Sequence, residues 1–140
     1  MENVEVIREM LDAAVRGDEE AFIAHLTPDV EWDDREGWPG VRQMYHGRAG
    51  VRKWWDAFRR VGGRILKAET EDLVAADGNR VLLDVFGTFQ GTGGEQTEFN
   101  VRAWYVFWIR DSKVARAQLF WTRREALETA GLLEHDQGVP

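Results

Sequence analysis

Asp34 is the residue whose type and position most favour chemistry. It ends a short predicted strand, Val30 to Asp34, and shares one strand face with Trp32. The strand opens into a loop directly after Asp34, so we expect the carboxyl at the mouth of an apolar pocket. A carboxyl that loses water in such a place has a raised pKa. As a base it can take a proton from a carbon next to a carbonyl group.

Two further observations bear on this hypothesis. Tyr105, on a later predicted strand, can donate a hydrogen bond to a developing oxyanion, which is often the larger catalytic contribution. The alternative is a structural Asp34 that caps the loop or pairs with one of three nearby cations, Arg35, Arg42 or Arg48. Both interpretations stay open at this point.

Helices account for the first part of the chain. Apolar residues at helical spacing predict a helix over 3–16 that Gly17 ends. Asp18 is a predicted N-cap for a second helix, which we expect Pro28 to end. Residues 35–46 are predicted as a loop, and the third helix is expected over 48–61.

The second half of the chain predicts strands joined by turns. The expected strands are Ile65 to Ala76, Val81 to Gln90, Gln96 to Arg110, and Val114 to Trp121. Short turns between them suit an antiparallel meander. A capping-box pattern from Thr122 to Glu125 then predicts a short final helix. The predicted fold is α+β, with helices on one face of a curved sheet. We expect a single domain over 1–133 and a polar tail over 134–140.

Composition narrows the function classes. The 140 residues carry a net charge of −7 without a basic run, which argues against a nucleic-acid partner. There is no cysteine, and no apolar run approaches the roughly 20 residues that span a bilayer. The acidic N-terminus lacks the features of a signal peptide, so a cytoplasmic protein without membrane contact is expected. We predict no metal, because no three residues have the spacing of a metal site. No cofactor is predicted either.

The histidines are weaker candidates for chemistry. His25 lies near apolar residues of the second predicted helix and is interpreted as a packed or interface histidine. His46 precedes the third helix, where a hydrogen bond within the loop and a place at the pocket mouth are the two alternatives. Neither position defines a role.

Alternation along the predicted strands separates two apolar faces. One face should line a pocket with few polar groups, which suits an apolar or aromatic small molecule. The residues expected around that pocket are Met10, Ala14, Trp32, Trp55, Phe58, Val81, Leu83, Val85, Ala103, Tyr105, Phe107, Leu119 and Trp121.

The other face carries Phe86, Trp104, Trp108 and Phe120 mixed with arginines. A monomer rarely exposes that much aromatic surface, and this mixture is typical of subunit contacts. We therefore predict a homodimer through this face. The alternative is that a terminal segment covers part of it.

Several segments together resemble the SnoaL-like branch of the nuclear-transport-factor-2-like (NTF2-like) superfamily, over about residues 4–132. The matching segments are Arg16-Gly17-Asp18, Thr27-Pro28-Asp29-Val30-Glu31-Trp32, Tyr45-His46-Gly47-Arg48-Ala49-Gly50-Val51, 106–114 and 125–132. The resemblance implies a cone-shaped, cystatin-like domain in which three N-terminal helices and a curved, mostly antiparallel sheet enclose a pocket. It does not select a function, because the superfamily holds isomerases, cyclases, hydrolases and binders.

A more distant resemblance to ketosteroid isomerase implies roles for individual residues. Asp34 falls at that family's general-base aspartate, and Trp55 and Trp121 fall at pocket aromatics. Met10 stands where the family has an oxyanion-hole tyrosine, and it cannot donate a hydrogen bond. Tyr105 stands approximately at the family's protonated oxyanion-hole aspartate, and it can donate a hydrogen bond. Steroid isomerisation as such is therefore not expected.

This chain also lacks the key catalytic groups of two other branches of the superfamily. SnoaL-type polyketide cyclases use an acid–base aspartate from the late strands, where this chain has Ala117, Gln118 and Leu119. The epoxide-hydrolase branch needs an Asp–Arg–Asp arrangement, and only Asp34 is expected to face inward. Three hypotheses follow: an isomerase or cyclase using Asp34 and Tyr105, a non-catalytic binder of an apolar small molecule, or a dimerisation module with a vestigial cavity.

Overall fold

The computed structural model describes residues 2–37, 41–60, 63–74, 78–90 and 98–132, and these form four helices and six strands. The predicted 134–140 tail lies outside the described residues. In chain order the elements are α1 (Asn3–Arg16), α2 (Glu19–Ala24), β1 (Leu26–Asp33), β2 (Met44–His46), α3 (Gly47–Arg60), β3 (Gly63–Val74), β4 (Arg80–Gln90), β5 (Glu98–Arg110), β6 (Lys113–Phe120) and α4 (Arg123–Ala130). Among the described helices, none has the length and apolar character needed to cross a membrane.

The six strands form one curved sheet in the order β2-β1-β6-β5-β4-β3. Neighbouring strands are antiparallel except for β1 and β6, which run parallel. The predicted meander from β3 to β6 and the predicted α+β class are both confirmed. Asp111 and Ser112, between β5 and β6, both have positive φ (51° and 61°), as a two-residue hairpin turn of type I′ requires.

The second helix is shorter than predicted. Asp18 does cap it, since its carboxylate accepts the Ala21 backbone N–H at 3.1 Å. The helix ends at Ala24, however, because the chain joins the sheet at once: the Val114 N–H donates to the His25 carbonyl at 2.8 Å. Pro28 therefore lies inside β1, at an irregularity in the β1–β6 pairing where a missing N–H is tolerated.

The loop predicted over 35–46 is also partly wrong. Its last residues form β2, in which Tyr45 pairs with Trp32 of β1. Tyr45 is buried, and its hydroxyl donates to the Val41 carbonyl at 2.8 Å. Three residues are too few to show a strand period, so the pairing could only be found in three dimensions.

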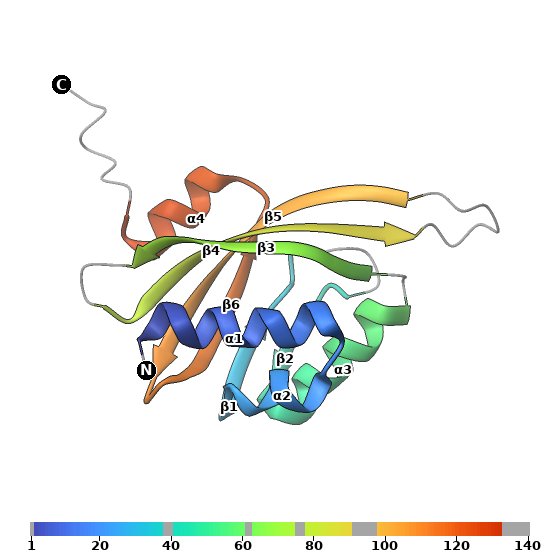
Figure 1. Cartoon of the computed structure of the whole chain (residues 1–140), viewed down its shortest axis with the longest axis horizontal. Helices are drawn as coiled ribbons and strands as arrows, with labels where there is room; N and C mark the ends of the chain where they lie inside the picture. The colour runs from blue at the N-terminus through green and yellow to red at the C-terminus, as the bar shows by residue number, and fades with distance from the viewer. Residues whose placement is uncertain (1, 38–40, 61–62, 75–77, 91–97, 133–140) are drawn as a thin grey trace.

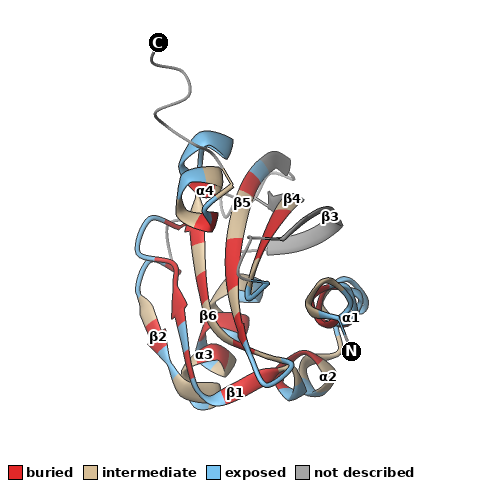
Figure 2. Cartoon of the chain, turned by 90° about the vertical axis from the view of Figure 1, so that its left-hand side faces the viewer, coloured by how far each residue is buried: buried red, intermediate tan, exposed pale blue. Residues whose placement is uncertain are grey.

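Both faces of the sheet carry apolar side chains, as strand alternation predicted, and both pack against helices of this chain. On the inner face, side chains such as Leu83 and Phe107 pack against α1, α2 and α3. On the outer face, Leu82 and Val106 pack against Ala126 and Ala130 of α4. Figure 1 shows α4 on the side of the sheet opposite α1, and Figure 2 shows buried segments on both sides of the strands.

The outer aromatic residues are therefore partly covered by this chain's own last helix. Trp104, Trp108 and Phe120 are half-buried against the α4 contact, whereas Phe86 is exposed. Helix α4 starts at the predicted capping box, in which the Thr122 hydroxyl oxygen accepts the Glu125 N–H at 3.2 Å. The alternative that a terminal segment covers part of this face is therefore confirmed for the part that α4 contacts. The homodimer stays a prediction.

Candidate active site

The backbone around Asp34 is held on both sides. Its N–H donates to the Gln43 carbonyl at 3.1 Å, which ties the end of β1 to the segment leading into β2. Its carbonyl accepts the Gly37 N–H at 2.7 Å. A Cβ on Gly37 would lie 2.8 Å from that carbonyl oxygen, so only glycine permits this tight turn. The turn directs the Asp34 side chain into the protein, where it is 2% exposed.

Two donors from distant elements hold the Asp34 carboxyl. The Trp54 indole N–H, from α3, donates to Oδ2 at 2.6 Å. The Tyr105 hydroxyl, from β5, lies 3.0 Å from Oδ1 and 3.2 Å from Oδ2. These contacts join three elements at one acidic group.

Burial raises the pKa of Asp34 to about 7, because the charged form loses its water. The hydrogen bonds from Trp54 and Tyr105 oppose this rise, and the charge of Asp33 adds to it. At neutral pH the acid and the carboxylate are therefore both populated. A group in that state can accept and return a proton.

The alternative that pairs Asp34 with an arginine is wrong. Arg35 pairs with Asp33, at 2.8 Å from Nη2 to Oδ2. Arg42 donates to the Gly37 carbonyl, and Arg48 donates to the Leu26 carbonyl. Within the described part of the chain, no Arg, Lys or His forms an ion pair with Asp34.

Tyr105 lies where the sequence analysis placed it, on the inner face beside Asp34. Its hydroxyl hydrogen is directed to the Asp34 carboxyl, whereas it was expected to serve a substrate oxygen. Burial, followed by the nearby Asp34 charge, raises the pKa of Tyr105 well above its usual range. The phenol therefore stays protonated and acts as a donor.

Trp54 is a candidate site residue that was not predicted from the sequence. Trp54 and Trp55 are adjacent within the helix predicted over 48–61, and the distant resemblance selected Trp55. Both are buried, but it is Trp54 that reaches Asp34. The available signal was that either indole could donate to an inward-facing carboxyl. Ring orientation, which depends on packing, decides between them.

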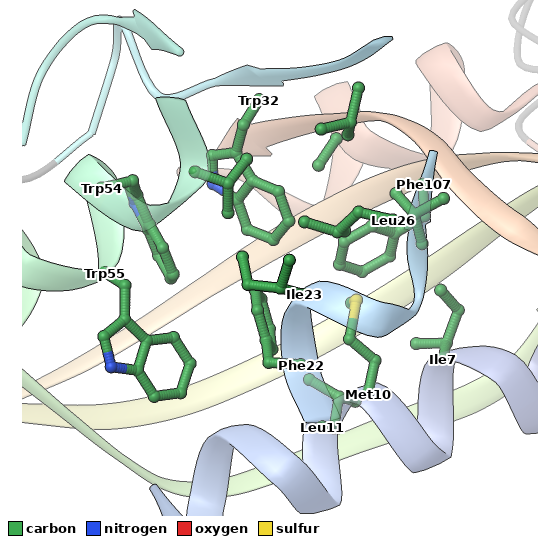
Figure 3. Packing of buried hydrophobic residues seen from close by; sticks show 14 of the residues in the cluster. Ile7, Met10, Leu11, Phe22, Ile23, Leu26, Trp32, Trp54, Trp55 and Phe107 are labelled. Carbon is green, nitrogen blue, oxygen red and sulfur yellow. The ribbon is translucent and has the colours of Figure 1, made fainter. Parts of the chain in front are cut away.

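The inner rings form a continuous aromatic cluster (Figure 3). Trp32 lies 4.9 Å from Trp54 between ring centroids, and Phe58 stacks on Trp54 at 5.3 Å. Trp55 contacts Phe22 at 5.1 Å instead. We use the term aromatic cluster for Phe22, Trp32, Trp54, Trp55, Phe58, Tyr105 and Phe107.

Of the other residues predicted to line the pocket, some are buried in the core, whereas Trp121 is exposed. Met10, Leu83 and Leu119 are buried, and Val85 is half-buried against the inner core. Trp121, expected on the last strand, lies just beyond the end of β6 and is 39% exposed. Its indole N–H donates to the Glu36 carbonyl, so it contacts the loop that follows Asp34.

His25 and His46 form no part of the group around Asp34. His25 lies beside Glu9 of α1, with 3.8 Å between Nε2 and the carboxylate, and burial lowers the pKa of His25. His46 is exposed at the end of β2. Over the described ranges, no group of three or more His, Asp or Glu side chains could hold a metal ion.

Comparison with known proteins gives a family and a fold. The SnoaL-like domain family matches residues 7–117. No curated protein matches the chain. Among solved structures, a candidate polyketide cyclase from Pseudomonas putida KT2440 is 22% identical, with a TM-score of 0.68, and the match covers 93% of this chain and 98% of that one.

Two more structures are similar over most of their length. An NTF2-like protein from Burkholderia xenovorans LB400 is 22% identical, with a TM-score of 0.64 and coverage of 92% and 95%. The epoxide hydrolase/cyclase-like enzyme SalBIII, which acts in pyran ring formation, is 20% identical, with a TM-score of 0.69 and coverage of 87% and 92%. At these identities the likeness shows the fold alone, which is the predicted NTF2-like, cystatin-like fold.

Proposed function

The chain belongs to the SnoaL-like domain family, and we propose that it is an isomerase or cyclase acting on a small apolar or aromatic carbonyl compound. The observation that carries the proposal is Asp34: a buried carboxyl with a pKa of about 7, two fixed donors and no described cationic partner. Perturbed carboxyls of this kind are typical of acid–base sites.

In the proposed step the Asp34 carboxylate removes a proton from a carbon next to the carbonyl group. The C–H bond breaks, its electron pair moves towards the carbonyl oxygen to form an enolate, and the proton stays on Asp34. Return of this proton to another carbon completes an isomerisation. Attack of the enolate on a second carbonyl, with the proton returned to the new alkoxide, completes a cyclisation.

The Asp34 partners support this step through position and charge. Trp54 and Tyr105 fix the carboxyl plane, so the lone pairs of its oxygens keep one direction. They also stabilise the carboxylate, which keeps the pKa of Asp34 near neutrality despite complete burial. A base near the working pH is the most effective for proton transfer.

One observation favours a second candidate, a non-catalytic binder of an apolar small molecule. Trp54 and Tyr105 both donate to Asp34 itself, so neither N–H nor O–H is turned towards a substrate. A binder needs only the apolar aromatic cluster and one polar contact. The two candidates differ in whether a bound ketone exchanges its protons.

The proposal is tested by the exchange of deuterium from the buffer into 2-tetralone. NMR monitors the loss of the signals of the protons next to the carbonyl group. We expect the wild type to accelerate exchange, with a rate that rises with pH through about 7 as Asp34 ionises. Asp34→Asn should lower the rate about 100-fold or more, since general-base catalysis contributes that much. The matched control is Asp33→Asn, the adjacent carboxylate on the other sheet face, which should keep most of the rate.

Equal rates for the wild type and Asp34→Asn would contradict the proposed function. Thermal shifts with 2-tetralone separate the two candidates, because a ligand that binds the folded state raises the melting temperature. Binding without accelerated exchange would support the non-catalytic binder.

A further inference from the structure

Trp32 carries a buried hydrogen-bond donor that nothing described in the chain satisfies. The side chain is 2% exposed, and its Nε1 has no hydrogen-bond partner among the described residues. A buried N–H without a partner destabilises the folded state, because the group loses its hydrogen bonds to water. Buried indole N–H groups usually find an acceptor, so this one needs an explanation.

The unpartnered N–H lies next to the acidic group. The Trp32 ring contacts Trp54 at 4.9 Å and Tyr105 at 5.6 Å, and these are the two residues that hold Asp34. In Figure 3 the nitrogen of Trp32 is on the side of its ring that faces Trp54. This N–H acts as a weak hydrogen-bond donor that lowers the pKa of both Asp34 and Tyr105, but it makes no hydrogen bond of normal geometry to either oxygen.

The three donors around Asp34 are therefore not equivalent. Trp54 and Tyr105 are already bound to the carboxyl, at 2.6 Å and 3.0 Å for their shortest contacts. Trp32 alone among them has an N–H without a well-formed hydrogen bond. A substrate oxygen that reached the Trp32 N–H would satisfy this donor, and it would then lie near the group that accepts a proton.

We propose that the Trp32 indole N–H binds the carbonyl oxygen of the substrate and stabilises the negative charge that this oxygen gains. The inference rests on the proposed function and deepens it: the substrate is a planar aromatic ketone whose oxygen faces Trp32 while a neighbouring C–H faces Asp34. This assigns to Trp32 the donor role that the sequence analysis gave to Tyr105. Preorganised donors to a developing oxyanion are among the larger contributions to catalysis.

The test uses two probes of nearly equal shape, fluorenone and fluorene, of which only fluorenone has an oxygen acceptor. Proton–nitrogen NMR reports the indole N–H of each of the seven tryptophans, after sequential assignment on the wild-type protein. We expect fluorenone to shift the Trp32 indole N–H signal downfield. Fluorene should cause no such downfield shift. Fluorenone should also bind about tenfold more tightly, as one hydrogen bond predicts.

Trp32→Phe should bring the two affinities close to each other. The matched control is Trp104→Phe, because Trp104 also has a buried Nε1 without a described partner but lies on the outer face. This variant should keep the difference. The wild-type spectra and affinities test the inference even if Trp32→Phe does not fold.

Equal affinities for the two probes, no binding of either, or a downfield shift at another indole instead of Trp32, would overturn the inference. Failure of the proposed function is recognised separately. It would leave 2-tetralone exchange unchanged in Asp34→Asn, whatever Trp32 binds.

Discussion

Asp33 and Asp34 are adjacent in the chain and almost equally buried, yet they have opposite electrostatic surroundings. They are 4% and 2% exposed. Asp33 accepts hydrogen bonds from Arg35 and contacts Arg116, and the hydrogen bond from Arg35 is the main cause of its lowered pKa. Asp34 has only uncharged donors, and burial raises its pKa to about 7.

The difference shows that exposure alone does not set the protonation state of a carboxyl. Alternation along β1 turns consecutive side chains to opposite faces of the sheet. The outer face offers Arg116, which lies over the Trp108 ring at 5.5 Å, and the inner face offers an aromatic cluster. A charge partner keeps Asp33 ionised, whereas burial without such a partner raises the pKa of Asp34, so Asp34 can exchange a proton near neutral pH.

The largest effect expected from this comparison is on the stability of Asp34→Asn. The folded-state pKa of Asp34 is raised, so the stability contributed by its neutral form is present below the unfolded pKa of 3.8 and is lost as pH rises to about 7. The loss is on the order of 4 kcal/mol. Urea unfolding across this pH range should show wild-type stability falling relative to Asp34→Asn by that amount.

The measurement is a difference between two proteins, so the other titrating groups cancel to first order. A constant stability difference between wild type and Asp34→Asn over the whole range would contradict the raised pKa. The comparison needs no ligand and does not depend on the proposed function.

A smaller effect of opposite sign is expected for Asp33→Asn. The pKa of Asp33 is lowered, so its contribution is present above the unfolded pKa and is lost as pH falls through the folded pKa. Losing the charged hydrogen bonds with Arg35 should cost about 2 kcal/mol at neutral pH. Urea unfolding should show this cost vanish in acid, and an equal cost in acid would sink the interpretation.

Much of the fold could be predicted because its signals are local. Helical spacing in α1 and α3, the turn at Asp111 and Ser112, and the capping box at Thr122 each depend on neighbouring residues. The errors fall where distant pairing decides. The chain leaves α2 early because β6 receives His25, and β2 exists because β1 pairs with it.

The candidate site likewise contains residues that could be predicted from the sequence and residues that could not. Strand alternation together with a resemblance selected Asp34 and Tyr105, and both lie in one hydrogen-bonded group. Trp54 was missed because helical spacing cannot choose between adjacent indoles on one buried face. The unpaired N–H of Trp32 could not be predicted either, since it depends on an acceptor that is lacking in the described structure.

The most direct test of the account is the pKa of Asp34 itself. Carbon-13 NMR of the labelled side-chain carboxyls follows Asp33 and Asp34 in one titration, assigned with Asp34→Asn and Asp33→Asn. We predict a midpoint of about 7 for Asp34, while Asp33 is already ionised at the acid end of that transition. An Asp34 midpoint near the ordinary value of about 3.9 would contradict the claim that this buried carboxyl is poised to accept and return a proton.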